Sequence, residues 1–224
     1  MHTSWVTFDC FGTLVDWNAG FTAILTPIAG HRTADLLRAY HGFERQLEAD
    51  RPHRSYREVL ATSLSLAAKK VDVALPESQT SILAQAWSSL PVFPDVEPAL
   101  AKLRSTGYNL AVLTNCDDGL FEQVHRGFQI PFDCVVTAER VCDYKPSLAH
   151  FRFFSRVSGI DHHRWVHVAC SWFHDIRPAY EFGVPRIWLD RERTGEDASL
   201  ASRRISSAED LVESVRQVMA GGAP

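Results

Sequence analysis

The sequence has few of the features of a secreted, zinc-binding or membrane-spanning protein. Its 224 residues include five cysteines, and no two of them form a Cys-x-x-Cys pair. We therefore expect reduced thiols, as in cytoplasmic proteins, and no structural zinc site. No stretch approaches the ~20 consecutive apolar residues of a membrane span. The first residues also lack the basic segment and apolar run of a secretion signal.

A strong charge of either sign is also absent. The formal net charge is −4, which gives no sign of the basic surface by which proteins bind nucleic acids. Hydrophobic residues make up 46% of the chain, a fraction typical of a globular protein that buries a core. The length suits one large domain, or a domain that carries a sizeable insertion.

Short apolar runs alternate with segments of helical periodicity. This alternation is typical of a parallel sheet with helices on both faces, so we predict an α/β, Rossmann-like fold. The predicted strands cover residues 5–8, 110–113, 134–137, 165–168 and 186–189, and the predicted helices cover residues 95–105, 118–126, 147–158 and 176–182.

One long segment interrupts the alternation. Residues 16–90 contain no convincing strand, and their clearest helical runs are 33–47, 55–68 and 77–88. We predict that residues 16–90 form an α-helical cap domain, inserted after the first strand. Residues 1–15 and 91–224 would then form the α/β core domain.

In such a fold, sites form at the carboxyl ends of the parallel strands. Asp9 follows the first predicted strand directly and precedes a glycine turn, and Thr114 and Asn115 end the second strand. Lys145 and Asp175 follow later strands. A carboxylate at a strand tip, beside free backbone N–H groups, is placed to act as a nucleophile.

Four motifs in order give the chain a resemblance to a known family. They are FDCFGTLVDW (8–17), VLTNCDD (112–118), YKPSLAHF (144–151) and HVACSWFHDIRPAYEFGVPRIWLDR (167–191). Together they resemble the motifs of the haloacid dehalogenase superfamily of hydrolases and, within it, the L-2-haloacid dehalogenases. The resemblance covers nearly the whole chain.

The resemblance implies that Asp9 attacks C2 of a small 2-haloacid and expels halide. Water would then hydrolyse the aspartyl ester. Lys145 would keep Asp9 ionised, because an opposite charge nearby lowers the pKa of a carboxyl group. Asp175 would orient Lys145 or help to activate the water. Thr114 and Asn115 would bind the substrate carboxylate or the leaving group.

The resemblance also implies an arginine in the first long cap helix as a cradle for the departing halide. Arg38 is the best match, and Arg45 is the alternative. Phe11 and Trp17 would supply an apolar wall that excludes water, and Trp172 would lie at the same substrate site. Core packing is an equally reasonable role for the aromatic residues. Tyr40 is a further candidate for the wall.

Phe11 separates dehalogenation from phosphate ester cleavage. An alkoxide leaving group needs a proton from a general acid, and the phosphatases of the superfamily use an Asp at this position. Phe11 cannot donate a proton, whereas halide leaves without one. Cys170 stands where metal-dependent relatives place an acid. We therefore expect no cofactor, and Mg²⁺ bound through Asp9 and Asp175 only if the protein is a phosphatase.

Several residues depart from the dehalogenase pattern. Cys170 and Trp172 replace small polar residues, and Phe151 replaces a tyrosine. Three alternatives therefore stay open: a Mg²⁺-dependent phosphatase acting on a small phosphate ester, a C–N hydrolase of azetidine-2-carboxylate type, and a non-catalytic scaffold. We expect a short carboxylic acid as substrate, no nucleic-acid or membrane partner, and a cytoplasmic protein. The resemblance also implies a homodimer.

Overall fold

A six-stranded parallel β-sheet forms the centre of the protein, seen in a computed structural model that describes residues 4–221. The strands lie in the order β3-β2-β1-β4-β5-β6, and every neighbouring pair is parallel. This confirms the predicted fold class. The strands are β1 (Trp5–Phe8), β2 (Asn109–Thr114), β3 (Cys134–Thr137), β4 (Trp165–Ala169), β5 (Arg186–Leu189) and β6 (Arg203–Ile205).

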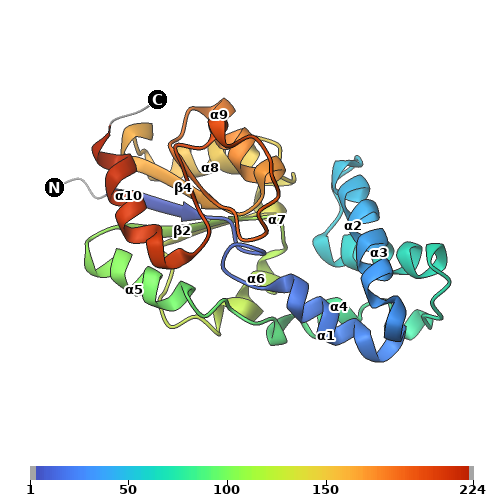
Figure 1. The fold of residues 1–224 in the computed structure, drawn as a ribbon. Helices are drawn as coiled ribbons and strands as arrows, with labels where there is room; N and C mark the ends of the chain where they lie inside the picture. The colour runs from blue at the N-terminus through green and yellow to red at the C-terminus, as the bar shows by residue number, and fades with distance from the viewer. Residues whose placement is uncertain (1–3, 222–224) are drawn as a thin grey trace.

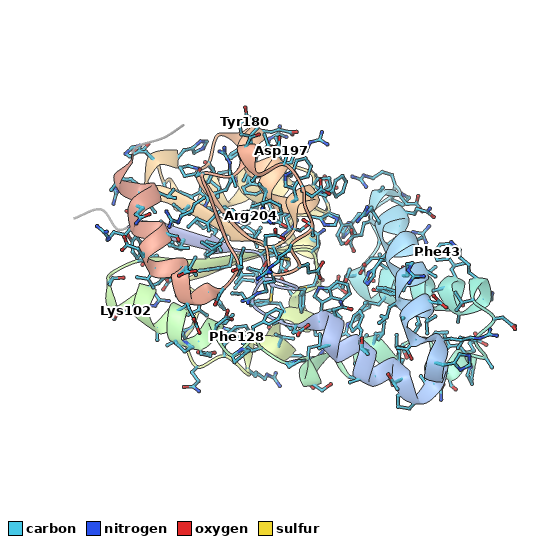
Figure 2. All side chains as sticks on the ribbon, in the orientation of Figure 1. Phe43, Lys102, Phe128, Tyr180, Asp197 and Arg204 are labelled. Carbon is cyan, nitrogen blue, oxygen red and sulfur yellow. The ribbon has the colours of Figure 1, made fainter. Side chains whose placement is uncertain are left out.

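Helices cover both faces of the sheet (Figure 1). Side chains alternate along each strand, so Val112 packs in one hydrophobic cluster and Leu113 in another. Figure 2 labels Lys102 and Tyr180 on helices α5 and α9, on opposite sides of the sheet. The helices of this part are α5 (Val96–Ser105), α6 (Asp118–His125), α7 (Ala138–Val141), α8 (Ala149–Ser158), α9 (Arg177–Phe182) and α10 (Leu211–Ala220).

A second group of helices lies between β1 and β2 in the sequence and to one side of the sheet in space (Figure 1). It comprises α1 (Trp17–Ala29), α2 (Thr33–Ala49), α3 (Tyr56–Lys70) and α4 (Ile82–Gln85). The predicted helix over 77–88 is wrong as a single element. The chain there forms a 3₁₀ turn at Glu77–Gln79, α4, and a second 3₁₀ turn at Trp87–Ser89.

Local sequence signals explain where several of these helices begin and end. Ser55 and Glu58 form a capping box at the start of α3, and Lys69 and Lys70 lie in its last turn. The Asp16 side chain accepts a hydrogen bond from the backbone N–H of Ala19 and caps α1. None of the helices within residues 4–221 is both long and apolar enough to cross a lipid bilayer.

Candidate active site

Asp9 lies at the carboxyl edge of the sheet, directly after β1. Its Oδ1 is 2.8 Å from Nζ of Lys145, and its Oδ2 accepts a hydrogen bond of 2.8 Å from the Thr13 hydroxyl. Gly12 makes the turn that brings Thr13 back, with φ of 89°. A Cβ atom there would lie 2.7 Å from Sγ of Cys170, so the turn requires glycine for both its conformation and its space.

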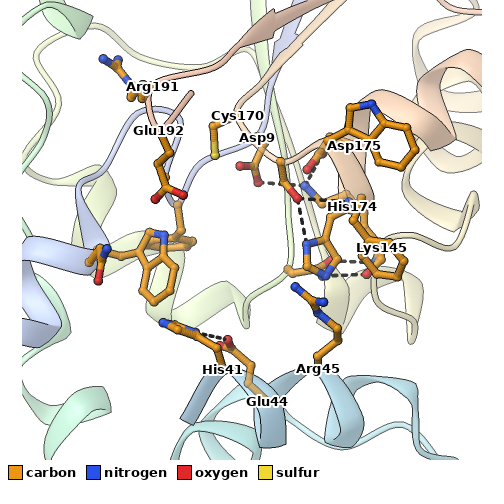
Figure 3. A pocket seen from close by; sticks show the side chains of 18 of the residues that line it. Asp9, His41, Glu44, Arg45, Lys145, Cys170, His174, Asp175, Arg191 and Glu192 are labelled. Atoms are coloured by element: carbon orange, nitrogen blue, oxygen red, sulfur yellow. Dashed lines mark hydrogen bonds and ion pairs between the residues drawn. The ribbon is translucent and has the colours of Figure 1, made fainter. Parts of the chain in front are cut away.

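Lys145 is the buried cation of the site, and its side chain is only 1% exposed. Its ammonium group donates to Asp9 Oδ1 at 2.8 Å, to Asp175 Oδ1 at 2.6 Å and to the backbone oxygen of Leu113 at 2.8 Å. These bonds use all the donors of an ammonium group. Lys145 is therefore held in one position between the two carboxylates (Figure 3).

Burial and charge act against each other on these groups. Burial lowers the pKa of Lys145, but attraction to Asp175 and Asp9 outweighs it and leaves that pKa above its usual value. Burial raises the pKa of Asp175, but attraction to Lys145 and a hydrogen bond from His167 lower it to about 2. Asp175 is therefore ionised at neutral pH.

The pKa of Asp9 moves in the other direction. Burial raises it, and attraction to Lys145 opposes this effect without reversing it, partly because Asp175 repels the Asp9 charge. The contact between Lys145 and Asp9 was predicted from the sequence. The net rise in pKa was not, since a sequence does not show how deeply a carboxyl group is buried.

Asp175 is held by an unusual turn and by a histidine. Residues Trp172–Ile176 form a single π-helical turn, a feature that often occurs at functional sites. Oδ1 of Asp175 lies 3.1 Å from Nε2 of His167, while the buried Oδ2 has no hydrogen-bond partner among the described residues.

Hydrogen bonds at both ring nitrogens hold the His167 side chain in place. The indole N–H of Trp165 donates to the Thr7 hydroxyl oxygen at 2.7 Å, and that hydroxyl lies 2.9 Å from Nδ1 of His167. The Asp175 carboxylate can only accept, so Nε2 carries a proton and donates to it.

The site opens into a pocket of about 420 Å³ between the sheet edge and the helices of the second group. Asp9, Lys145 and Asp175 line it, so the three predicted catalytic side chains lie in one place. Four of the predicted substrate-binding residues also line it, namely Phe11, Trp17, Asn115 and Trp172.

These four residues differ in what they offer a ligand. The Phe11 ring packs against Trp87 at 4.8 Å and Trp17 against Phe21 at 5.3 Å, so both form an apolar wall. The indole N–H of Trp172 donates to the backbone oxygen of Asp197 at 3.0 Å. Asn115 forms hydrogen bonds of 2.8 and 3.0 Å to the backbone of Lys145, so its amide positions the lysine loop.

Thr114 and Tyr40 do not line the pocket, although the sequence predicted them near the substrate. Thr114 is fully buried and its hydroxyl lies 3.7 Å from Sγ of Cys116, because strand alternation turns its side chain away from the pocket. Tyr40 is also fully buried, and its hydroxyl donates to Glu44 at 2.8 Å.

Arg38 also lies outside the pocket lining, and Arg45 lies in it. The Arg38 side chain is 77% exposed and pairs with Asp35 at 2.9 Å. The Arg45 guanidinium lies 5.3 Å from the ring centre of Phe173 and has no carboxylate partner within residues 4–221. Arg45, the alternative candidate from the sequence, is therefore the arginine that faces the site (Figure 3).

Sequence reasoning missed a group of titratable residues on the helix side of the pocket. His41, Glu44 and Glu48 come from α2, and His174 comes from the π-helical turn. Burial raises the pKa of Glu44, but hydrogen bonds from His41, Tyr56 and Tyr40 leave it below its usual value. The sequence did contain one signal for this group of residues. Glu44 and Glu48 are four residues apart, which places both on one face of a helix.

The residues present do not suit a magnesium ion. Asp9 and Asp175 would be the ligands, yet the Lys145 ammonium group already lies within 2.8 Å of both carboxylates. Cys170 adds a thiol whose pKa is raised by burial, and a neutral thiol is a poor ligand for a hard cation. Nowhere in residues 4–221 do three or more His, Cys, Asp or Glu side chains form a group that could hold a metal ion.

Comparison with known proteins is consistent with this geometry. The chain is 26% identical over 196 residues to (S)-2-haloacid dehalogenase H-109 of Pseudomonas putida. This alignment covers 84% of this chain and 85% of the relative. It is 30% identical to the glyceraldehyde 3-phosphate phosphatase of Methanocaldococcus jannaschii, over only 56% of this chain and 57% of the relative.

Solved structures share the fold. One is the L-2-haloacid dehalogenase from Xanthobacter autotrophicus with chloropropionic acid covalently bound, which aligns over 96% of this chain and 98% of its own with a TM-score of 0.81 and 20% identity. The family model of the haloacid dehalogenase-like hydrolases matches residues 3–169, well over half of the sequence. The chain therefore belongs to the haloacid dehalogenase-like hydrolases.

Proposed function

We propose that the protein hydrolyses a small 2-haloacid to the 2-hydroxy acid, with Asp9 as the nucleophile. The observation that carries this proposal is the surroundings of Asp9. Its carboxylate is held between Lys145 and Thr13, at the base of a pocket in which Phe11 offers no acid to protonate a leaving group. Such a site suits attack on carbon with a leaving group that departs as a weak base.

In the first step, an Asp9 carboxylate oxygen forms a bond to C2, and the carbon–halogen bond breaks with its electron pair on the halide. Lys145 holds the carboxylate in line for this attack and offsets its charge. Arg45, whose charge is free of carboxylate partners among the described residues, would receive the halide. Phe11 and Trp17 would exclude bulk water, which strengthens these charge interactions.

In the second step, water attacks the carboxyl carbon of the Asp9 ester and releases the 2-hydroxy acid. The oxygen from water enters Asp9, one proton of the water passes to the departing alkoxide oxygen of the 2-hydroxy acid, and the other proton passes to solvent. Asp175 keeps Lys145 in place through both steps. No step requires a metal ion.

We also propose that residues 16–90 act as a cap domain over a core of residues 1–15 and 91–224. Helix α2 supplies His41, Glu44 and Arg45 to one wall of the pocket, while the sheet edge supplies Asp9 and Lys145 to the other. Opening of the cap would admit the substrate. Its closure would complete the site.

The test incubates the protein with racemic 2-chloropropionate and EDTA in H₂¹⁸O over many turnovers. We expect chloride release, ¹⁸O in the peptide that contains Asp9, and loss of both in Asp9→Asn. Chloride release without label in that peptide would rule out the ester. Release of phosphate from phosphate esters that stops in EDTA would instead support the phosphatase alternative.

A further inference from the structure

Glu44 is a carboxylate of the pocket lining that the proposed chemistry leaves unused. It projects from α2, on the side of the pocket opposite Asp9, and its side chain is 16% exposed (Figure 3). Its Oε1 accepts hydrogen bonds from the hydroxyl groups of Tyr40 at 2.8 Å and Tyr56 at 2.6 Å. These two bonds hold the carboxylate in one position on the pocket wall.

One acceptor site of this carboxylate stays open. Each carboxylate oxygen has two lone pairs. The two tyrosine hydroxyls occupy those of Oε1, whereas Oε2 has a single contact among the described residues, at 3.2 Å to Nδ1 of His41. A ligand in the pocket can therefore donate one hydrogen bond to Oε2 of Glu44.

No lysine or arginine of residues 4–221 balances the charge of Glu44. Its only ion-pair contact in that part of the chain is with His41. Burial raises the pKa of Glu44, but the hydrogen bonds around it outweigh that effect, so the group keeps the ionised form that carboxyl groups ordinarily have at neutral pH. A largely buried charge without a permanent counter-ion is costly. A cationic ligand group would relieve that cost.

Aromatic rings flank the carboxylate on both sides. The ring centre of Trp17 lies 4.6 Å from that of His41, and the ring centre of Tyr56 lies 5.8 Å from that of Trp87. All four residues line the pocket. Aromatic rings attract cations and also present an apolar surface. These surroundings suit a group that joins a positive charge to a carbon chain.

We propose that Glu44 binds an ammonium group of the substrate, which donates a hydrogen bond to Oε2 while its carbon chain lies against the aromatic rings. This inference rests on the proposed function and names the substrate class as a 2-haloacid whose chain ends in an ammonium group. A guanidinium group fits less well. Its two parallel hydrogen bonds need a free lone pair on each carboxylate oxygen, and Oε1 has none left.

The size of the pocket supports a substrate longer than 2-chloropropionate. Its volume of about 420 Å³ lies in the range of sites for drug-sized ligands, which begins at roughly 300 Å³. A three-carbon haloacid would leave much of this space empty. Asp9 and Glu44 line opposite walls, so a longer substrate can contact both. More acidic than basic side chains line the pocket, which favours a positive group at the far end of the chain.

The experiment measures binding of n-butylammonium and n-butanol by NMR titration at about pH 8 in about 0.1 M sodium chloride. Salt screens the long-range field, and this pH lies above the range in which histidine ordinarily titrates. The probes share a chain and differ in the charged end. We expect n-butylammonium to bind roughly tenfold more tightly than n-butanol, because it gains a charge-assisted hydrogen bond. Glu44→Gln keeps the shape but not the charge, so it should remove this difference.

Glu192→Gln is the matched control, because it removes the charge of an exposed acid of the same lining. It should change n-butylammonium binding by less than about twofold, since the salt screens an exposed charge. n-Butanol should bind to both variants as it binds to the wild type, which verifies that the pocket is intact. The inference is overturned if Glu44→Gln binds n-butylammonium as tightly as the wild type, or if Glu192→Gln weakens it equally.

Turnover tests whether this ammonium group belongs to the substrate. 6-Amino-2-chlorohexanoate and 2-chloroheptanoate differ only in an ammonium or a methyl group at the end of the chain. With spontaneous chloride loss subtracted, kcat/KM should be roughly tenfold higher for the amino compound. Glu44→Gln should bring the ratio of the two values to about one. A wild-type ratio of one or less would overturn the ammonium-bearing substrate class.

The two proposals fail in different ways. Binding of n-butylammonium that depends on Glu44, in a protein that shows no ¹⁸O in Asp9, would overturn the nucleophilic mechanism alone. Chloride release with label in Asp9, but with n-butylammonium binding indifferent to Glu44, would overturn the ammonium subsite alone.

Discussion

At the scale of single residues, the site depends on one buried ammonium group between two carboxylates. Lys145 and Asp175 are each only 1% exposed, and the Asp9 side chain is 9% exposed. Buried charges are tolerated when they are paired and hydrogen-bonded, and removal of one partner leaves the others uncompensated. Lys145 therefore matters for stability as well as for the chemistry of Asp9.

We predict that Lys145→Met abolishes dehalogenation and lowers the free energy of unfolding by about 3–5 kcal/mol at pH 7. Without the ammonium group, the pKa of Asp175 rises above that of the unfolded chain, and the pKa of Asp9, which is already raised, rises further. The variant then gains stability relative to the wild type as pH falls, because protonation removes the buried charges.

The wild type loses the contribution of Asp175 between about pH 4 and pH 2, since its folded pKa of about 2 lies below the unfolded value.

Urea unfolding at pH 7 and pH 4.5 measures this effect. The loss should be clearly smaller at pH 4.5, and an equal loss at both pH values would contradict the electrostatic account. Lys102→Met is the matched control, because Lys102 lies on the exposed face of α5. It should have no measurable effect on stability or activity.

The choice between Arg38 and Arg45 shows where sequence reasoning ends. The two positions are seven residues apart, which is nearly two full turns, so both project from the same side of α2. Periodicity cannot separate them. The two arginines are roughly 10 Å apart along the helix axis, so only one of them can reach the pocket. Which one does so depends on how α2 packs against the core.

At the scale of secondary-structure elements, the start of α3 is stabilised from the core. Oδ1 of Asp117 accepts from the backbone N–H of Tyr56 at 2.7 Å, and Oδ2 accepts from that of Arg57 at 3.0 Å. The Ser55 side chain accepts from the third N–H, that of Glu58. An anion at a helix N-terminus is stabilising. Asp117, which follows β2, therefore stabilises the start of a helix of the proposed cap.

We predict that Asp117→Ala lowers the free energy of unfolding by about 1–3 kcal/mol, because it leaves two N–H groups at the start of α3 unpaired. The KM for 2-chloropropionate should rise more than kcat falls, since α3 packs against α2, which carries Arg45 and Glu48. Asp117→Asn keeps one acceptor and should be intermediate. Asp161→Ala, at an exposed position without a side-chain cap, is the control. An unchanged KM in Asp117→Ala would show that this contact does not position the cap helices.

Elements with strong local patterns were predictable, and those that depend on packing were not. The strands at residues 5–8, 134–137 and 186–189 were predicted with the observed bounds, because each is a short apolar or β-branched run. β6 was missed because it is a three-residue edge strand that begins with the exposed Arg203 and Arg204. The four-residue α4 was merged into a longer helix, because periodicity does not reveal short interruptions.

At the scale of the whole molecule, the pocket concentrates negative charge. Seven acidic and three basic side chains line it. The acidic residues are Asp9, Glu44, Glu48, Asp175, Asp190, Glu192 and Glu196, and the basic residues are Arg45, Lys145 and Arg191. A substrate anion must pass this field before it reaches Asp9 at the sheet edge. Association should therefore be slower than for a neutral ligand.

We predict that kcat/KM for 2-chloropropionate rises roughly two- to threefold as ionic strength increases from about 0.02 to 0.2 M, because salt screens the repulsion over a Debye length of about 10 Å. Sodium sulfate should be used, since chloride is a product of the reaction. Glu192 and Glu196 are exposed acids of the lining, so the double variant Glu192→Gln, Glu196→Gln should raise kcat/KM at low salt and flatten the salt response. A fall in kcat/KM with increasing salt would contradict this prediction. It would mean that attraction of the anion to the basic groups, chiefly Arg45, outweighs its repulsion by the acids.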